Sequence, residues 1–163
     1  MKPGYCAKAV VDKGGSSYLL GRGRAGDHPH VAEMYENVFP RKANQGLPPE
    51  NEKQRRIWLQ RIWQHAENFL VWKEDAVVGH CSLMADGALR DAEFMIFVLQ
   101  PFRGKGLGSL LTQAAVDHAR EMNLALVWLT VALSNFRAIN LYRKFGFVFA
   151  KDMGYDPVMV LHL

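Results

Sequence analysis

The sequence predicts one mixed α/β domain in which helices cover both faces of a single sheet. Its 163 residues suit one hydrophobic core, and its composition of 49% apolar and 22% charged residues is ordinary for a folded globular chain. Strand-like and helix-like segments alternate in the order β-α-α-β-β-β-α-β-α-β-β. The expected strands are 18–24, 69–73, 76–85, 92–99, 125–131, 147–150 and 157–163, and the expected helices are 28–39, 50–66, 106–122 and 135–145.

The first third of the chain begins with polar residues. Residues 1–17 include the run Gly14-Gly15-Ser16-Ser17 and are expected to form a loose leader before a single domain at 18–163. Asp27 can cap the first helix, whose first turn tolerates Pro29. Apolar and aromatic residues at helical spacing predict the second helix. They are Ile57, Trp58, Ile62 and His65.

The remaining elements have clearer patterns. A turn at Glu74-Asp75 separates two strands, and residues 92–99 are almost entirely apolar, as in a strand buried inside a sheet. Residues 106–122 carry one apolar stripe and form the clearest helix. Gly146 is suited to end the last helix.

The sharpest motif is the run Arg103-Gly104-Lys105-Gly106-Leu107-Gly108. It lies between a buried strand and an amphipathic helix, where glycines allow close backbone approach to a ligand. The start of a helix offers unpaired N–H groups and the positive end of its dipole. Arg103 and Lys105 add charge beside that point. The run therefore predicts a pyrophosphate site.

Two other phosphate motifs fit less well. A Walker loop needs Lys-Ser or Lys-Thr after its last glycine, and a dinucleotide fingerprint needs glycine where Ser109 stands and an acid where Trp128 stands. The upstream run Gly21-Arg22-Gly23-Arg24-Ala25-Gly26 does match G-x-G-x-x-G. However, the helix after it leads into a proline-rich loop and a second helix, which argues against dinucleotide binding there.

Charge and cysteine content narrow the class of protein. The net charge is +4 and the pI is about 9.2, but the basic residues are scattered and their clusters, Arg22/Arg24 and Arg55/Arg56, are short. This distribution favours a solvated mixed surface over a nucleic-acid site. Two cysteines are too few for a disulfide framework or a zinc site, which fits a reduced cytoplasmic protein. No secretory signal or membrane span is visible.

Two sequence patterns resemble the signatures of the GNAT superfamily of acetyl-CoA-dependent N-acetyltransferases, and they follow one another along the chain in the same order as in that family. The first, Q/R-x-x-G-x-G/A at a strand-to-helix turn, is matched by Arg103, Gly106 and Gly108. The strong resemblance covers residues 92–147, whereas residues 18–91 agree in element order only. The second signature is N-x-x-A-x-x-L-Y-x-x-x-G-F, matched here by Asn135, Ala138, Leu141, Tyr142, Gly146 and Phe147.

The resemblance implies a GNAT-like fold and acetyl-CoA as the acyl donor. In that family, the strands matching 92–99 and 125–131 splay apart and leave a slot for the pantetheine arm, which pairs with the main chain of the first strand. The backbone amides of 103–108 would hold the pyrophosphate. The cofactor-binding residues implied by the resemblance are Val98, Leu99, Arg103, Gly104, Lys105, Gly106, Leu107, Gly108, Asn135 and Tyr142.

The reaction needs groups that move protons. An amine with a pKa near 10.4 must lose a proton before it attacks, so burial or a general base must assist. Glu93, the only acid in its strand, is the candidate base, and His80 on the neighbouring strand and water are the alternatives. The resemblance places Tyr142 beside the cofactor sulfur, as the general acid. Cys81 is a candidate nucleophile without a clear base partner.

These observations predict an N-acetyltransferase that moves acetyl from acetyl-CoA directly to a primary amine of a small-molecule or peptide acceptor. The acceptor is not identified, because the acids and bases of residues 27–68 are balanced. The alternative is a module that binds acyl-CoA as a sensor without turnover. We expect no metal, no nucleic acid and no membrane partner. Homodimers are common in the family, and the sequence does not determine the oligomeric state.

Overall fold

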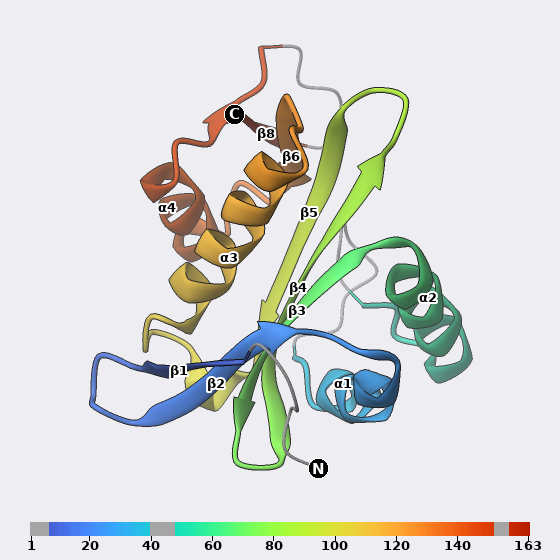
Figure 1. The fold of residues 1–163 in the computed structure, drawn as a ribbon, viewed down its shortest axis with the longest axis vertical. Helices are drawn as coiled ribbons and strands as arrows, with labels where there is room; N and C mark the ends of the chain where they lie inside the picture. Colours follow the sequence, from blue (N-terminus) through green and yellow to red (C-terminus); the bar gives the residue numbers. More distant parts are fainter. Residues whose placement is uncertain (1–6, 40–47, 152–156) are drawn as a thin grey trace.

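The computed structural model describes residues 7–39, 48–151 and 157–163. Within them the chain forms an eight-stranded sheet and four α-helices (Figure 1), which confirms the mixed α/β class. Most of the loop expected at 40–49 lies outside the described residues. In chain order the elements are β1 (Lys8–Val11), β2 (Ser17–Arg22), α1 (His28–Glu36), α2 (Glu52–His65), β3 (Glu67–Lys73), β4 (Ala76–Asp86), β5 (Asp91–Val98), α3 (Leu107–Glu121), β6 (Leu126–Thr130), α4 (Phe136–Lys144), β7 (Val148–Phe149) and β8 (Val158–His162).

Helices α1 and α2 lie against one face of the sheet, and α3 and α4 lie against the other (Figure 1). Each face has its own hydrophobic core. Strand β3 supplies both cores in alternation, because successive side chains of a strand point to opposite faces. Phe69 and Val71 join the core under α3, whereas Leu70 and Trp72 join the core under α1 and α2. Burial on both faces explains why these strands are apolar throughout.

The strand order is β1-β2-β3-β4-β5-β6-β8-β7, and the described pairs are antiparallel except β5 with β6, which is parallel. That parallel pairing is short. It runs from Asp91 opposite Leu126 to Glu93 opposite Trp128, and then stops. Strand β5 continues unpaired on this side to Val98. The two strands therefore part after Glu93, as the resemblance implied.

The N-terminal segment differs from the expected loose leader. Residues 8–11 form the edge strand β1, which pairs antiparallel with β2, and residues 12–16, which include most of the glycine–serine run, form the turn between them. Asp12 organises this turn: its Oδ1 accepts hydrogen bonds from the N–H groups of Gly14 (2.8 Å) and Ser16 (2.9 Å). A four-residue strand with one buried side chain, Val10, shows no clear alternation, so its sequence gives no strand signal.

Candidate active site

A cleft of about 850 Å³ opens beside the unpaired end of β5. Its walls come from β5, the loop before α3, the whole length of α4, the residues just after α1 and the β1–β2 turn. Its described lining residues include four cationic ones, and none of them is Asp or Glu. A concave site with cations and no carboxylate favours a polyanionic ligand. The four are Lys13, Arg103, Arg137 and Lys144.

The loop before α3, which we call the phosphate loop, forms with the first residues of α3 the geometry expected of a phosphate-binding site. We call this site, residues 103–108, the phosphate cradle. Gly104 and Gly106 have φ values of 79° and 94°, a left-handed conformation that favours glycine. The first helical N–H groups to find a carbonyl are those of Ser109 and Leu110, and both donate to the carbonyl oxygen of Gly106 (3.0 and 3.2 Å). The N–H groups just before them, at the start of α3, have no intrahelical acceptor. They remain as donors for an anion.

Three of the residues expected to bind the cofactor have structural roles in the fold. The Lys105 ammonium lies 5.3 Å from the centre of the Phe102 ring, and Lys105 does not line the cleft. The Leu107 side chain is buried in the core. A Cβ on Gly108 would lie 3.2 Å from Leu141 Cδ2, so this glycine lets α4 approach α3 closely. Of these three residues, only Gly108 lines the cleft, and it has no side chain.

The backbone of β5 faces the cleft at two residues. The N–H of Leu99 donates to the carbonyl oxygen of Val78 (3.0 Å), so Leu99 pairs with β4. Hydrogen-bonded and non-hydrogen-bonded pairs alternate along antiparallel strands, and the neighbouring pair is Val98 with Gly79. Val98 and Ile96 therefore direct their N–H and C=O groups away from β4, and both line the cleft. The geometry favours Ile96, which the sequence did not single out, over Leu99.

Part of the Arg103 guanidinium is held by hydrogen bonds to the main chain. Its Nε donates to the carbonyl oxygen of Val98 (2.8 Å), and its Nη2 donates to the carbonyl oxygen of Phe39 (3.1 Å), just after α1. Partial burial lowers the pKa of Arg103, and the nearby charge of Arg137 lowers this pKa further. Two cations that repel each other at the rim of one cleft are stabilised when an anion binds there.

Asn135 and Tyr142 both reach the cleft from α4. Asn135 caps the helix as predicted, because its Oδ1 accepts a hydrogen bond from the N–H of Ala138 (3.2 Å). Tyr142 is 7% exposed, and its ring packs edge-on against Phe94 and tilted against Phe147, with centroids 6.2 and 5.8 Å away.

The Tyr142 hydroxyl is placed to keep a proton. Burial raises the pKa of Tyr142 far above that of an ordinary tyrosine, and Cys81 adds to the rise. The described residues form no hydrogen bond with this hydroxyl. Among them, His28 Nε2 is the one fully buried polar side-chain atom that lacks a partner, so the Tyr142 hydroxyl is not fully buried. The hydroxyl is therefore open to the cleft. A protonated phenol in this position suits an acid better than a base.

Glu93 lies at the point where β5 and β6 separate, opposite Trp128. By strand alternation its side chain lies on the same face as Phe97, which packs against Tyr35 of α1. Its half-buried position raises the pKa of Glu93, and the charge of Arg61 on α2 partly offsets the rise. Glu93 thus lies on the α1/α2 face of the sheet and is not among the lining residues of the cleft, whereas Tyr142 lines the cleft and packs against Phe94 on the opposite face.

His80, the competing base, is fully buried in a closed network. Its Nε2 lies 2.9 Å from Asn68 Oδ1, and its Nδ1 lies 2.7 Å from the Tyr35 hydroxyl. Since an amide oxygen only accepts, Nε2 carries the proton and Nδ1 accepts from Tyr35. Burial lowers the pKa of His80 to about 3. The structure does not bring His80 into the cleft, and Cys81 is equally buried, which raises the pKa of its thiol.

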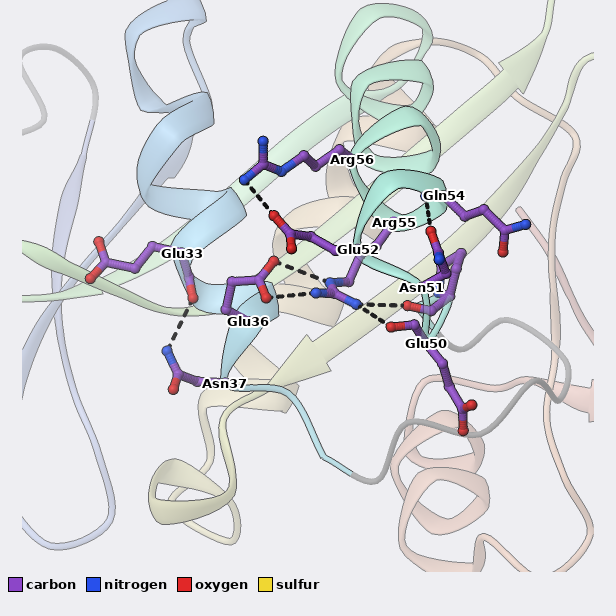
Figure 2. Close-up of polar contacts among 10 residues, drawn as sticks. Glu33, Glu36, Asn37, Glu50, Asn51, Glu52, Gln54, Arg55 and Arg56 are labelled. Atoms are coloured by element: carbon purple, nitrogen blue, oxygen red, sulfur yellow. Dashed lines mark hydrogen bonds and ion pairs between the residues drawn. The ribbon is translucent and has the colours of Figure 1, made fainter.

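Helices α1 and α2 are held together by Arg55, which is 3% exposed (Figure 2). Its Nε and Nη2 donate to the Glu36 carboxylate (3.3 and 2.6 Å), and its Nη1 donates to the carbonyl oxygens of Pro49 and Glu50 (3.0 and 2.8 Å). The neighbouring Arg56 is 73% exposed and pairs with Glu52. In the short Arg55/Arg56 cluster, Arg55 is therefore a structural residue, and only Arg56 belongs to the solvated surface.

The upstream glycine run does not form a phosphate cradle. Gly21 lies within β2, and a Cβ on Gly23 would lie 2.7 Å from Trp63 of α2. Gly23 therefore allows close packing of α2 against the end of β2. This packing explains the glycine without a dinucleotide.

Within the described residues, no helix is long and apolar enough to cross a membrane. The same residues contain no group of three or more His, Cys, Asp or Glu side chains arranged to hold a metal ion.

The fold and the cleft define a mixed α/β protein with a site for a polyanionic ligand. Comparison with known proteins identifies its family. Residues 31–147 match the model of the acetyltransferase (GNAT) family, so the chain belongs to that family and the resemblance is confirmed. It is 29% identical over 140 residues to the mycothiol acetyltransferase of Propionibacterium freudenreichii, covering 82% of this chain and 44% of that protein. It is 33% identical over 70 residues to the spermine/spermidine N(1)-acetyltransferase of Bacillus subtilis, covering 41% of this chain and 46% of that protein. The match spans less than half the length of each of these relatives.

A solved structure supports the fold independently. The GNAT domain of S. lividans PAT superposes with a TM-score of 0.84 at 14% identity, and the match covers 100% of both chains. At this identity the likeness concerns the fold alone.

Three cations that line the cleft were not identified from the sequence. Arg137 and Lys144 occupy variable positions within the second signature, where the pattern alone gives them no role. Lys13 lies in the segment expected to be a loose leader. Only its position relative to the phosphate loop connects it with the site.

Proposed function

We propose that this chain is an N-acetyltransferase that transfers acetyl from acetyl-CoA directly to a primary amine. One observation carries the proposal: a cleft with four described cations and no described carboxylate meets the unpaired edge of β5 and is lined by Tyr142. Family membership supports the same conclusion. The alternative is a module that binds acyl-CoA without turnover.

The residues present fit acetyl-CoA, which would supply an activated acetyl group as a thioester. The amides at the start of α3 and the cations of the cleft would hold its phosphates. The backbone groups of Ile96 and Val98 would pair with the amides of the pantetheine arm, as an added strand pairs with a sheet edge.

Tyr142 and Glu93 would manage the protons from opposite faces of the sheet. Tyr142 would donate its proton to the thiolate that leaves, since its raised pKa keeps the hydroxyl protonated at neutral pH. Glu93 would take a proton from the amine, directly or through water, because it is the last residue of β5 that pairs with β6 before the two strands separate. On this proposal the acceptor enters from the α1/α2 side.

Two secondary proposals concern the context of the protein. We place the activity in the cytoplasm, because Cys81 is a free, buried thiol and acetyl-CoA is an intracellular metabolite. A homodimer is consistent with the family, and light scattering on the purified chain would determine the oligomeric state.

Calorimetric titration with acetyl-CoA, with NAD and ATP as controls, tests the cofactor first. Selective binding of acetyl-CoA supports the proposal, and preference for NAD or ATP overturns it. Thiol release is then followed with a panel of spermidine, amino acids, an aminoglycoside and peptide N-termini. Turnover with any of these identifies an acceptor class. Binding without turnover across the panel favours the sensor.

A further inference from the structure

The β1–β2 turn lies against the phosphate loop, although the two are far apart in the sequence. The N–H of Lys13 donates to the carbonyl oxygen of Lys105 (3.1 Å). Along the same contact, Lys13 Cγ and Cε lie 3.7 and 3.9 Å from the point where a Cβ on Gly106 would be. The aliphatic stem of Lys13 therefore covers Gly106, the glycine just before α3, and Lys13 lines the cleft.

The turn is well organised by its own hydrogen bonds. Asp12 is 8% exposed and accepts from the N–H groups of Gly14 and Ser16 and from the Tyr18 hydroxyl (3.0 Å). The Tyr18 ring packs edge-on against Phe102, which precedes the phosphate loop, with centroids 6.3 Å apart. The turn is therefore fixed both internally and against the loop. The Asp12 carboxylate is already used by these three donors.

The charge of Lys13 is available to a ligand. Among the described residues, no carboxylate forms an ion pair with Lys13, and none lines the cleft beside it. Lys105, the lysine that the sequence placed in the cradle, has its ammonium over the Phe102 ring. Lys13 thus occupies the position above the start of α3 where a second cation of the cradle was expected.

We propose that Lys13 is a phosphate-binding residue of the coenzyme A site, presented by the β1–β2 hairpin. This inference rests on the proposed function. A lysine ammonium binds phosphate as a flexible point charge, and the amides at the start of α3 provide directed donors beside it. Coenzyme A carries two phosphate groups that this cation can bind, the pyrophosphate and the 3′-phosphate of the ribose.

The test is calorimetric titration of the full chain and its variants with coenzyme A, dephospho-coenzyme A and pantetheine. Lys13→Ala is compared with Lys8→Ala, because Lys8 is an exposed lysine of the same hairpin that does not line the cleft. Loss of one charge-assisted contact corresponds to about tenfold weaker binding of coenzyme A. Lys13→Arg retains most of the affinity, Lys8→Ala changes it less than twofold, and pantetheine affinity is unchanged in every variant.

The arms also identify which phosphate is bound. If Lys13 binds the 3′-phosphate, wild type and Lys13→Ala bind dephospho-coenzyme A equally. If it binds the pyrophosphate, the tenfold difference persists with that ligand. A smaller dependence of affinity on salt in Lys13→Ala than in wild type supports either assignment. Thermal melting checks that each variant is folded.

Three results would overturn the inference. One is a folded Lys13→Ala variant that binds coenzyme A as tightly as wild type. Another is an equal loss in Lys8→Ala, which would indicate only a general field of positive charge. The third is a wild-type chain that binds no coenzyme A, which also refutes the proposed function. Binding by wild type with no effect of Lys13→Ala refutes the role of Lys13 alone.

Discussion

Replacing Tyr142 with phenylalanine separates the chemistry of this residue from its packing. The ring is 7% exposed and contacts Phe94 and Phe147, and phenylalanine keeps both ring contacts. The hydroxyl has no hydrogen-bond partner among the described residues, so its removal leaves no group unsatisfied. We therefore expect the free energy of unfolding to change by less than about 1 kcal/mol.

The effect on turnover is expected to be much larger. A positioned general acid contributes about a hundredfold or more to the rate, which at 1.36 kcal/mol per factor of ten is about 2.7 kcal/mol of activation free energy. Because the phosphates would bind the amides at the start of α3 and not this hydroxyl, affinity for acetyl-CoA is expected to change less than threefold. Because the Tyr142 pKa is raised, wild-type activity loses no essential proton from this residue between pH 6 and about 9.

Thiol release from acetyl-CoA, measured with a saturating acceptor from pH 6 to 9, gives kcat for both proteins. Calorimetry gives acetyl-CoA affinity, and urea unfolding gives stability. If Tyr142→Phe is folded and keeps kcat within threefold of wild type across this range, the acid assignment is refuted. If the affinity falls as much as kcat, Tyr142 contributes to binding instead.

Three further predictions concern the base, the cradle and the helix anchor. Because the pKa of Glu93 is raised, we expect kcat/KM to fall on the acid side at a pH above 4.5, the ordinary pKa of glutamate. Glu93→Gln should remove this pH dependence and lower kcat at least tenfold. A pH–rate profile that Glu93→Gln leaves unchanged would argue for water alone as the base. The folded state binds this proton more tightly than the unfolded state, so Glu93→Gln does not lower stability at pH 7 in urea unfolding. Gly106→Val forces a β-branched residue to a φ of 94°, which costs about 1–3 kcal/mol and should weaken acetyl-CoA binding at least tenfold in calorimetry; unchanged affinity in a folded variant would refute the cradle. Arg55→Ala removes a buried side chain with four hydrogen bonds and should lower the unfolding free energy by about 2–4 kcal/mol, against about 0.5 kcal/mol or less for Arg56→Ala; equal losses would refute the anchoring role of Arg55.

The local structure around the candidate site was predictable because its signals lie close together in the chain. The cradle of residues 103–108 depends on glycines that adopt positive φ and on a helix that starts immediately after them, and both signals lie within one short segment. Asn135 caps α4 through a hydrogen bond three residues away. Apolar periodicity likewise predicted the order of helices and strands from β2 onward, because burial of a helix stripe or a strand face leaves its period in the sequence.

Strand register determines which backbone groups reach the cleft, and the pattern of apolar residues in the sequence does not specify this register. Leu99 and Val98 are both apolar residues at the end of β5, yet the N–H of Leu99 pairs with β4 while Val98 faces the cleft. His80 lies one residue before the buried Cys81 on an apolar strand. Its network with Asn68 and Tyr35 exists only because three elements meet there.

The charges of the site depended most on tertiary structure. From the sequence alone, Lys105 belonged to the cradle, Lys13 to a leader and Arg55 to a solvated cluster. In the folded chain, the ammonium of Lys105 lies over Phe102, Lys13 lines the cleft and Arg55 is buried between α1 and α2. Long cationic side chains reach several ångströms and make contacts between distant segments, so their partners are set by the packing of the whole chain and not by their neighbours in sequence.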